Sequence, residues 1–241
     1  MHDLLQIVHF HTRTPLIHSQ ILDKLKILNV LSVANLRRLL PLLVLPLLCL
    51  LSCEDNVSNE AEYVDWKATN EKAFAQRMAE ARTAIAEAQA AYGAQWMDHC
   101  PWRMYRTYAQ DERVPGSAAD SICVRVIAAG PAGESPLYTD SVAVNYMLRL
   151  QPSVSYSEGQ VADYSGPFPS AESVFHPDFA QPTRFLTSNT AEGFTTALLH
   201  MRPGDRWEVY VPQELGYGSA ASSKLPAYSM LTFDMQLVRF W

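Results

Sequence analysis

The chain has 241 residues, of which 48% are hydrophobic, so it is long enough to bury the core of one or two domains. Its formal net charge of −6 provides no basic surface for a nucleic acid, and we exclude nucleic acid as a partner. The histidines and cysteines are not spaced as metal ligands are, and we expect no metal site.

The first 52 residues have the pattern of a targeting segment. Arg37 and Arg38 supply a positive stretch, residues 39–51 are apolar, and the run ends in L-L-S-C at Cys53. An apolar run of this length is too short for a membrane-spanning helix, which needs about 20 residues. The small residue before Cys53 resembles the end of a bacterial lipoprotein signal. That resemblance implies acylation of Cys53, a lipid anchor in the membrane and a place in the bacterial cell envelope.

The alternative for residues 39–51, a buried core helix, is disfavoured by Pro41 and Pro46 within the run. Residues 1–36 are unlike a signal peptide, and their one methionine is at the first position, so we expect translation to start downstream at a codon other than that of methionine. Residues 53–62 are acidic and polar, which predicts a solvated tether.

Residues 63–138 are predicted to form a long helix and a small region of strands and turns. The stretch 63–92 is rich in Ala, Glu, Lys, Gln and Arg and contains no Gly or Pro before Gly93, a composition typical of a helix. The alternating, β-branched stretch 121–128 predicts a strand. The helix has one narrow apolar stripe, which predicts packing on the following domain or pairing in a dimer: Trp66, Ala73, Phe74, Met78, Ala81, Ile85 and Ala88.

Two cysteines remain if the signal is removed and Cys53 is acylated. Cys100 and Cys123 would then lie outside the cytosol, where a disulfide is permitted. Two buried free thiols agree equally well with the sequence, and both alternatives stay open at this point.

The C-terminal part, residues 190–241, carries three ordered motifs. A short amphipathic helix is predicted at 190–201 and runs into a charged turn, together reading G-F-T-T-A-L-L-H-M-R-P-G-D-R. The motifs V-P-Q-E-L-G-Y-G and L-P-A-Y-S-M-L-T-F-D follow. In this order and at these separations they resemble the C-terminal half of the FKBP-type peptidyl-prolyl isomerase domain. Three linked motifs are a specific signal, whereas any one of them alone would be weak.

The N-terminal half of the same family is matched more loosely. The strand-like D-S-V-A-V-N-Y places Tyr146 at the first pocket tyrosine, and G-Q-V-A-D-Y-S places Asp163 at the family aspartate. On this alignment Ala162 replaces a pocket phenylalanine. A second alignment through V-F-H-P would restore a ring at Phe175 and lose the aspartate, and the spacing from Tyr146 favours the first. We expect extra residues after the aspartate, from which Phe175 could enter the pocket.

The resemblance implies an α+β fold, in which an antiparallel β-sheet at 139–241 wraps around a short helix and follows the long α-helix and small region at 63–138. It also implies a site. Tyr217 would donate a hydrogen bond to a substrate carbonyl, the Ala191 N–H would be a second donor, and Asp163 would orient local polar groups. The substrate-binding residues would be Tyr146, Ala162, Ala191, Phe194 (in place of the usual tryptophan), Leu225 and Phe233.

The chemistry of such a domain is simple. An X-Pro bond interconverts slowly because its partial double bond has to twist against a barrier of about 18–20 kcal/mol. Lowering this barrier requires a dry, aromatic-lined cleft and hydrogen-bond donors, and we therefore expect no cofactor and no metal. The resemblance implies a peptidyl-prolyl cis-trans isomerase, which we expect to act on proline-containing envelope or secreted polypeptides. Ala162, Thr190 and Ala191 trim the apolar lining, which predicts weak activity. The alternative is a weakly active or inactive chaperone or peptide-binding module.

Overall fold

The computed structural model describes residues 61–111, 113–166, 174–222 and 224–241. The predicted signal, Cys53 and most of the predicted tether lie outside these residues. The described residues belong to one compact unit, Asn59–Trp241. Within these ranges, no helix combines the length and the apolar character needed to cross a membrane.

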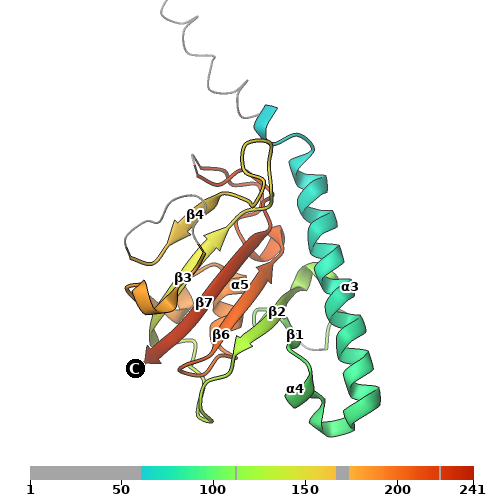
Figure 1. The fold of residues 1–241 in the computed structure, drawn as a ribbon, viewed down its shortest axis with the longest axis vertical. Helices are drawn as coiled ribbons and strands as arrows, with labels where there is room; N and C mark the ends of the chain where they lie inside the picture. The colour runs from blue at the N-terminus through green and yellow to red at the C-terminus, as the bar shows by residue number, and fades with distance from the viewer. Residues whose placement is uncertain (1–60, 112, 167–173, 223) are drawn as a thin grey trace, which may run out of the picture. The chain divides into compact units, whose positions relative to one another are not determined.

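An antiparallel sheet of seven strands is the main element of the fold (Figure 1). Its strand order is β1-β2-β6-β7-β3-β4, and β5 pairs with β3 away from this path. Since β2 pairs with β6, the region before Thr139 shares its sheet with the predicted domain. The strands are β1 Trp102–Arg106, β2 Ser121–Ala128, β3 Ser141–Arg149, β4 Val161–Tyr164, β5 Thr183–Leu186, β6 Arg206–Val211 and β7 Leu231–Phe240.

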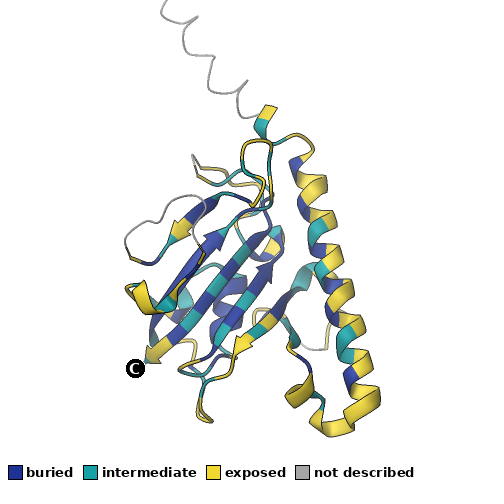
Figure 2. Ribbon diagram, in the orientation of Figure 1, coloured by how far each residue is buried: buried dark blue, intermediate teal, exposed yellow. Residues whose placement is uncertain are grey.

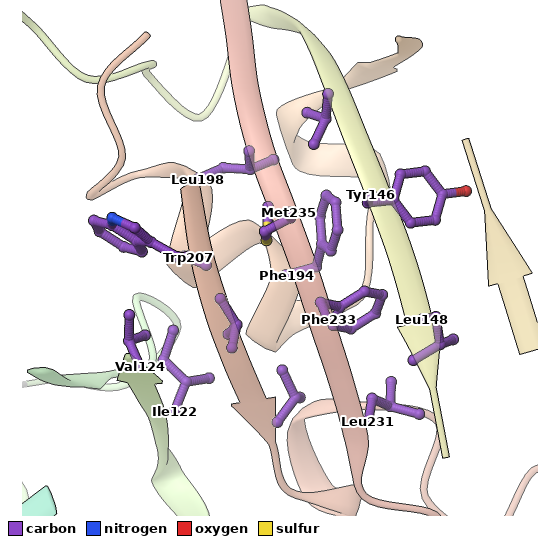
Figure 3. Close-up of a cluster of buried hydrophobic side chains, with 14 of the residues drawn as sticks. Ile122, Val124, Tyr146, Leu148, Phe194, Leu198, Trp207, Leu231, Phe233 and Met235 are labelled. Carbon is purple, nitrogen blue, oxygen red and sulfur yellow. The ribbon is translucent and has the colours of Figure 1, made fainter. Parts of the chain in front are cut away.

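The short helix α5, Glu192–Leu198, packs on one face of the sheet and forms the centre of the main hydrophobic core. Every residue of α5 after Glu192 is buried. The helix can approach the sheet closely because Gly193 has no side chain: a Cβ there would lie 2.3 Å from Cγ1 of Val211. Figure 3 shows the core side chains converging between α5 and the strands. This antiparallel sheet on a short helix confirms the predicted α+β architecture.

The long helix α3, Trp66–Tyr92, covers the opposite face of the sheet at β1, β2 and β6. Its buried side chains form one stripe along the helix (Figure 2), and Phe74 and Met78 share a hydrophobic cluster with Cys123 and Tyr210. Gly93 ends the helix with a φ of 55° and donates its N–H to the carbonyl of Gln89. The predicted helix is confirmed, and its stripe packs on the domain.

Short helical pieces complete the fold. The α-helical turn α4 follows α3 and leads into β1. Five 3₁₀ turns lie in the connections between the described elements. Their bounds, with that of α4, are α4 Trp96–His99, η1 Gly93–Gln95, η2 Ala118–Asp120, η3 Pro177–Phe179, η4 Thr187–Asn189 and η5 Gln213–Leu215.

The two cysteines in the described region are free and buried. Cys100 lies just before β1, and Cys123 lies within β2 under α3. Burial raises the pKa of the Cys123 thiol to about 12. Of the two alternatives left open by the sequence, the structure therefore has two buried free thiols.

Candidate functional site

A cavity of about 380 Å³ opens beside the N-terminal end of α5. Side chains from β3, β4, β5 and β7 meet there with the residues that lead into α5 and with the turn after η5. The lining residues are Tyr146, Asp163, Phe185, Ser188, Asn189, Thr190, Ala191, Phe194, Tyr217 and Phe233.

Four aromatic rings form the apolar part of the cavity. Phe194 from α5 lies 5.0 Å from Phe233 and 5.9 Å from Tyr146, measured between ring centroids, and both contacts are edge-to-face. Phe185 from β5 completes the group at 5.9 Å from Phe194 and 5.8 Å from Tyr146. Figure 3 shows Tyr146, Phe194 and Phe233 reaching from three different elements into this region. Edge-on packing fixes the rings against one another and leaves a shaped apolar surface.

The polar side of the cavity begins with a bond between β3 and β4. The Tyr146 hydroxyl donates a hydrogen bond of 2.8 Å to Oδ2 of Asp163, and the Tyr164 N–H donates one of 2.9 Å to Oδ1. Burial of the ring and, after it, the bond to Asp163 raise the pKa of Tyr146. The Tyr146 hydroxyl therefore stays protonated at neutral pH and holds the carboxylate in place.

A β-bulge in β4 directs Asp163 to this position. In the pairing with β3, Leu148 lies opposite Asp163 and Arg149 lies opposite Val161, so Ala162 is the extra residue. An extra residue bends the strand and re-aims the side chains after it. As a result, Ala162 is buried in the core cluster on the α5 side, while the neighbouring Asp163 lines the cavity.

Two hydrogen-bond donors at the cavity are open to a ligand. Tyr217 is 52% exposed, and no described residue forms a hydrogen bond with its hydroxyl. The Ala191 N–H lies just before the first residue of α5, and no described residue accepts a hydrogen bond from it. The turn that presents Tyr217 depends on Gly218, whose φ of 55° favours glycine.

The structure brings together most of the site residues predicted from the sequence. Two differ in position: Ala162 is buried in the core, and Leu225 packs against the core cluster without lining the cavity. Those that line the cavity are Tyr146, Asp163, Ala191, Phe194, Tyr217 and Phe233.

The structure places Phe175 away from the cavity. Its ring is buried in a separate cluster with Met147 and Val161, and the guanidinium carbon of Arg206 lies 5.1 Å from the ring centroid. Because Met147 follows Tyr146 in β3, it points to the opposite face of the sheet. Phe175 therefore does not replace the ring missing at Ala162.

Sequence reasoning missed three lining residues, Phe185, Ser188 and Asn189. The only available signal was local: they stand directly before the helix motif, in the segment that leads into α5. No group of three or more His, Cys, Asp or Glu side chains in the described ranges is arranged to hold a metal ion.

The comparisons with known proteins agree with this geometry. Residues 133–238 match the family model described as FKBP-type peptidyl-prolyl cis-trans isomerase. These residues are an FKBP-type domain. The matched range contains every residue that lines the cavity and begins shortly before β3.

The FKBP-type domain has named relatives. The chain is 33% identical over 113 residues to a macrophage infectivity potentiator of Trypanosoma cruzi, a match covering 46% of this chain and 49% of that protein. It is 32% identical over 121 residues to the peptidyl-prolyl cis-trans isomerase Mip of Coxiella burnetii, covering 50% and 45%. The crystal structure of FkpA from Escherichia coli matches at 24% identity with a TM-score of 0.40, covering 72% of this chain and 70% of that one. The chain spans about half the length of the curated relatives it matches.

Proposed function

We propose that this chain is a peptidyl-prolyl cis-trans isomerase that acts on X-Pro bonds of envelope or secreted polypeptides. The observation that carries the proposal is the composition of the cavity. Aromatic rings packed edge-on surround a space that lies beside two hydrogen-bond donors, the Tyr217 hydroxyl and the Ala191 N–H, and no described residue accepts a hydrogen bond from either donor. The match of the surrounding domain to the isomerase family supports the same reaction.

The proposed mechanism uses binding and hydrogen bonding alone. The proline ring packs against Phe194, Phe233 and Tyr146, which removes water from the amide and favours its less polar, twisted form. The Tyr217 hydroxyl and the Ala191 N–H donate to carbonyl oxygens that move as the amide leaves planarity. Asp163 accepts a hydrogen bond from the Tyr146 hydroxyl and so fixes the position of the Tyr146 ring in the cavity wall. Asp163 therefore has a positioning role and transfers no proton.

Exchange spectroscopy on a short X-Pro peptide tests the proposal directly. With the full-length chain added, we expect cis and trans signals to interconvert faster than the uncatalysed rate, which is slow enough to be measured separately. Phe194→Ala is the matched variant, since it removes the ring at the centre of the cavity. Peptide binding without faster exchange would refute the isomerase and support the second candidate.

The second candidate is a peptide-binding module or chaperone with little or no turnover. It is favoured by the rim of the cavity, where Ser188, Asn189 and Thr190 present polar side chains. The Thr190 hydroxyl is 2.7 Å from that of Thr195, so this part of the rim is fixed by its own hydrogen bonds. A polar rim keeps water near the amide and weakens the desolvation on which catalysis depends.

We further propose that the protein is a lipoprotein of the bacterial cell envelope, anchored to the membrane through Cys53. The support is the L-L-S-C sequence that ends a short apolar run. Two or more acyl chains bind a bilayer stably, where one is marginal. The anchor would keep the isomerase domain close to polypeptides that emerge at the membrane.

A further inference from the structure

The first turns of α3 contact the 226–230 segment, which joins the turn of Tyr217 to β7. The indole N–H of Trp66 donates a hydrogen bond of 2.8 Å to the Ser229 hydroxyl, and that hydroxyl donates one of 2.7 Å to the carbonyl of Pro226. Trp66 and Ser229 are both buried. Trp66 of α3 thus orients the Ser229 hydroxyl, which bonds back to Pro226 within the 226–230 segment.

Asn70 makes a second bond to the same segment, one helical turn later. Its Oδ1 accepts the Met230 N–H at 2.8 Å, and its Nδ2 donates to the carbonyl of Trp66 at 2.7 Å. Asn70 is 1% exposed. A buried amide with both ends bonded is held in one orientation, and it replaces a backbone partner that Met230 lacks at the start of β7.

The 226–230 segment is in turn bonded to the turn that presents Tyr217. The Tyr228 N–H donates a hydrogen bond of 2.7 Å to the carbonyl of Gly218, the residue after Tyr217. Tyr228 has a φ of 63°, a strained value for a residue with a side chain, and Lys67 of α3 places Nζ 4.9 Å from its ring centroid. Such a conformation persists only where the surroundings impose it. Here α3 imposes the conformation by holding Ser229 and Met230, the two residues that follow Tyr228.

A parallel set of contacts reaches the other wall of the cavity. Glu62 accepts hydrogen bonds from the Ser155 N–H at 2.9 Å and its hydroxyl at 2.6 Å. The Tyr63 hydroxyl donates a hydrogen bond of 3.1 Å to Oε1 of Gln160, which directly precedes β4, the strand that carries Asp163. Residues on either side of the start of α3 therefore contact the segments that carry both polar walls of the cavity.

We propose that Trp66 and Asn70 are positioning residues for the cavity: by fixing Ser229 and Met230 they hold Tyr228, and through its bond to Gly218 they place the Tyr217 hydroxyl. This inference rests on the proposed isomerase function. Neither residue lines the cavity, so both act through Tyr217 and not on the substrate. The N-terminal helix is then a part of the site and not only a cover for the sheet.

The test is a double-mutant cycle on the full-length chain with an X-Pro peptide. Asn70→Leu removes both hydrogen bonds at similar volume, and we expect kcat/KM to fall about two- to tenfold, the effect of one weakened hydrogen bond in the transition state. In a Tyr217→Phe background the same substitution should change kcat/KM little, because the hydroxyl that it misplaces is already gone. Ala88→Gly is the matched control: it weakens α3 near its C-terminal end, outside the cluster that contains Met230, and should leave kcat/KM unchanged.

Trp66→Phe provides a second route if Asn70→Leu fails to fold. It keeps an aromatic ring, removes the donor to Ser229 and shortens the buried side chain, and it should give the same non-additive pattern with Tyr217→Phe. Losses that simply add in the cycle, or an equal loss in Ala88→Gly, would overturn the positioning role and leave a structural one. The NMR amide shifts of Tyr217 and Gly218 keep the two proposals apart. If the wild type is inactive, the isomerase proposal fails, while unchanged shifts in Asn70→Leu would overturn the positioning role independently.

Discussion

Tyr146 and Asp163 are joined by a hydrogen bond of 2.8 Å that links β3 to β4 at the edge of the cavity. The bond works in one direction, since the hydroxyl is the donor and the carboxylate only accepts. Each partner lines the cavity, and a second bond from Tyr164 restrains the carboxylate. The wall is therefore fixed before a substrate arrives, which is the condition for placing donors accurately.

Removal of the Tyr146 hydroxyl should change how stability depends on pH. Burial and the bond to Asp163 raise the pKa of Tyr146 above its ordinary value of about 10, so its contribution to stability is complete below that pH and is lost as the pH rises further. Urea unfolding between pH 8 and pH 12 should show the free energy of unfolding of the wild type falling more steeply than that of Tyr146→Phe. Parallel pH profiles would contradict this environment for the hydroxyl.

Tyr217→Phe separates catalysis from packing. The exposed ring stays, so the free energy of unfolding should change by less than about 0.5 kcal/mol. One neutral hydrogen bond contributes about 0.5–1.5 kcal/mol, and turnover should fall about two- to tenfold. Peptide exchange rates and a urea titration on the same sample measure both. An unaltered rate in an active protein would show that the hydroxyl has no part in the reaction.

Ala162→Phe distinguishes the sequence alignment from the observed packing. The alignment alone suggests that a phenylalanine would refill the cavity and improve peptide binding. The structure buries Ala162 in the core cluster, so the larger ring should instead destabilise the fold by about 1–3 kcal/mol through overpacking. Chemical denaturation gives the sign. A stable variant with tighter peptide binding would mean that the bulge can turn this side chain into the cavity.

The predicted boundary near Thr139 can be tested with two fragments. Residues 139–241 alone would lose the pairing of β2 with β6 and the cover of α3, which exposes a strand edge and the cluster around Tyr210. We expect this fragment to unfold at a lower urea concentration than residues 59–241, or to fail to fold. Equal midpoints, with peptide binding retained, would establish 139–241 as an independent domain.

Cys53→Ala tests the proposed anchor. A fatty-acid probe added to producing bacteria should label the wild-type protein, and the variant should be unlabelled and recovered outside the membrane fraction. Cys100→Ala serves as the control for general thiol labelling, because that buried cysteine should make no difference. Equal labelling of the wild type and of Cys53→Ala would refute the proposal that Cys53 carries a lipid anchor.

Elements that depend on neighbouring residues can be predicted from this sequence, and contacts between distant residues cannot. The helix at Trp66–Tyr92 and the strand at Ser121–Ala128 depend on local composition and periodicity, and their sequences predict them well. Asn70 shows the limit. A polar residue in a helix is expected to face solvent. Asn70 is instead buried, and its hydrogen-bond partner Met230 lies 160 positions away in the sequence. No local pattern contains that information.

The same limit applies within the cavity. Phe194 and Tyr217 were found because they occupy fixed places in motifs, although their roles in the reaction stay predictions. Phe185 was missed because β5 is short and its pairing with β3 decides which of its side chains faces inward. The position of Ala162 was missed because a bulge depends on the register between two strands, which neither strand specifies alone.

The extra residue in β4 makes the site sensitive to strand register as well as to residue type. A regular β4 that kept Val161 opposite Arg149 would place Asp163 opposite Met147, on the other face of the sheet, and the carboxylate would leave Tyr146. A change that removes the bulge by shifting the pairing in this way would therefore be as damaging as replacing the aspartate itself. Relatives that keep an aspartate in this strand should differ freely in the length of the connection that follows it, and not in the strand.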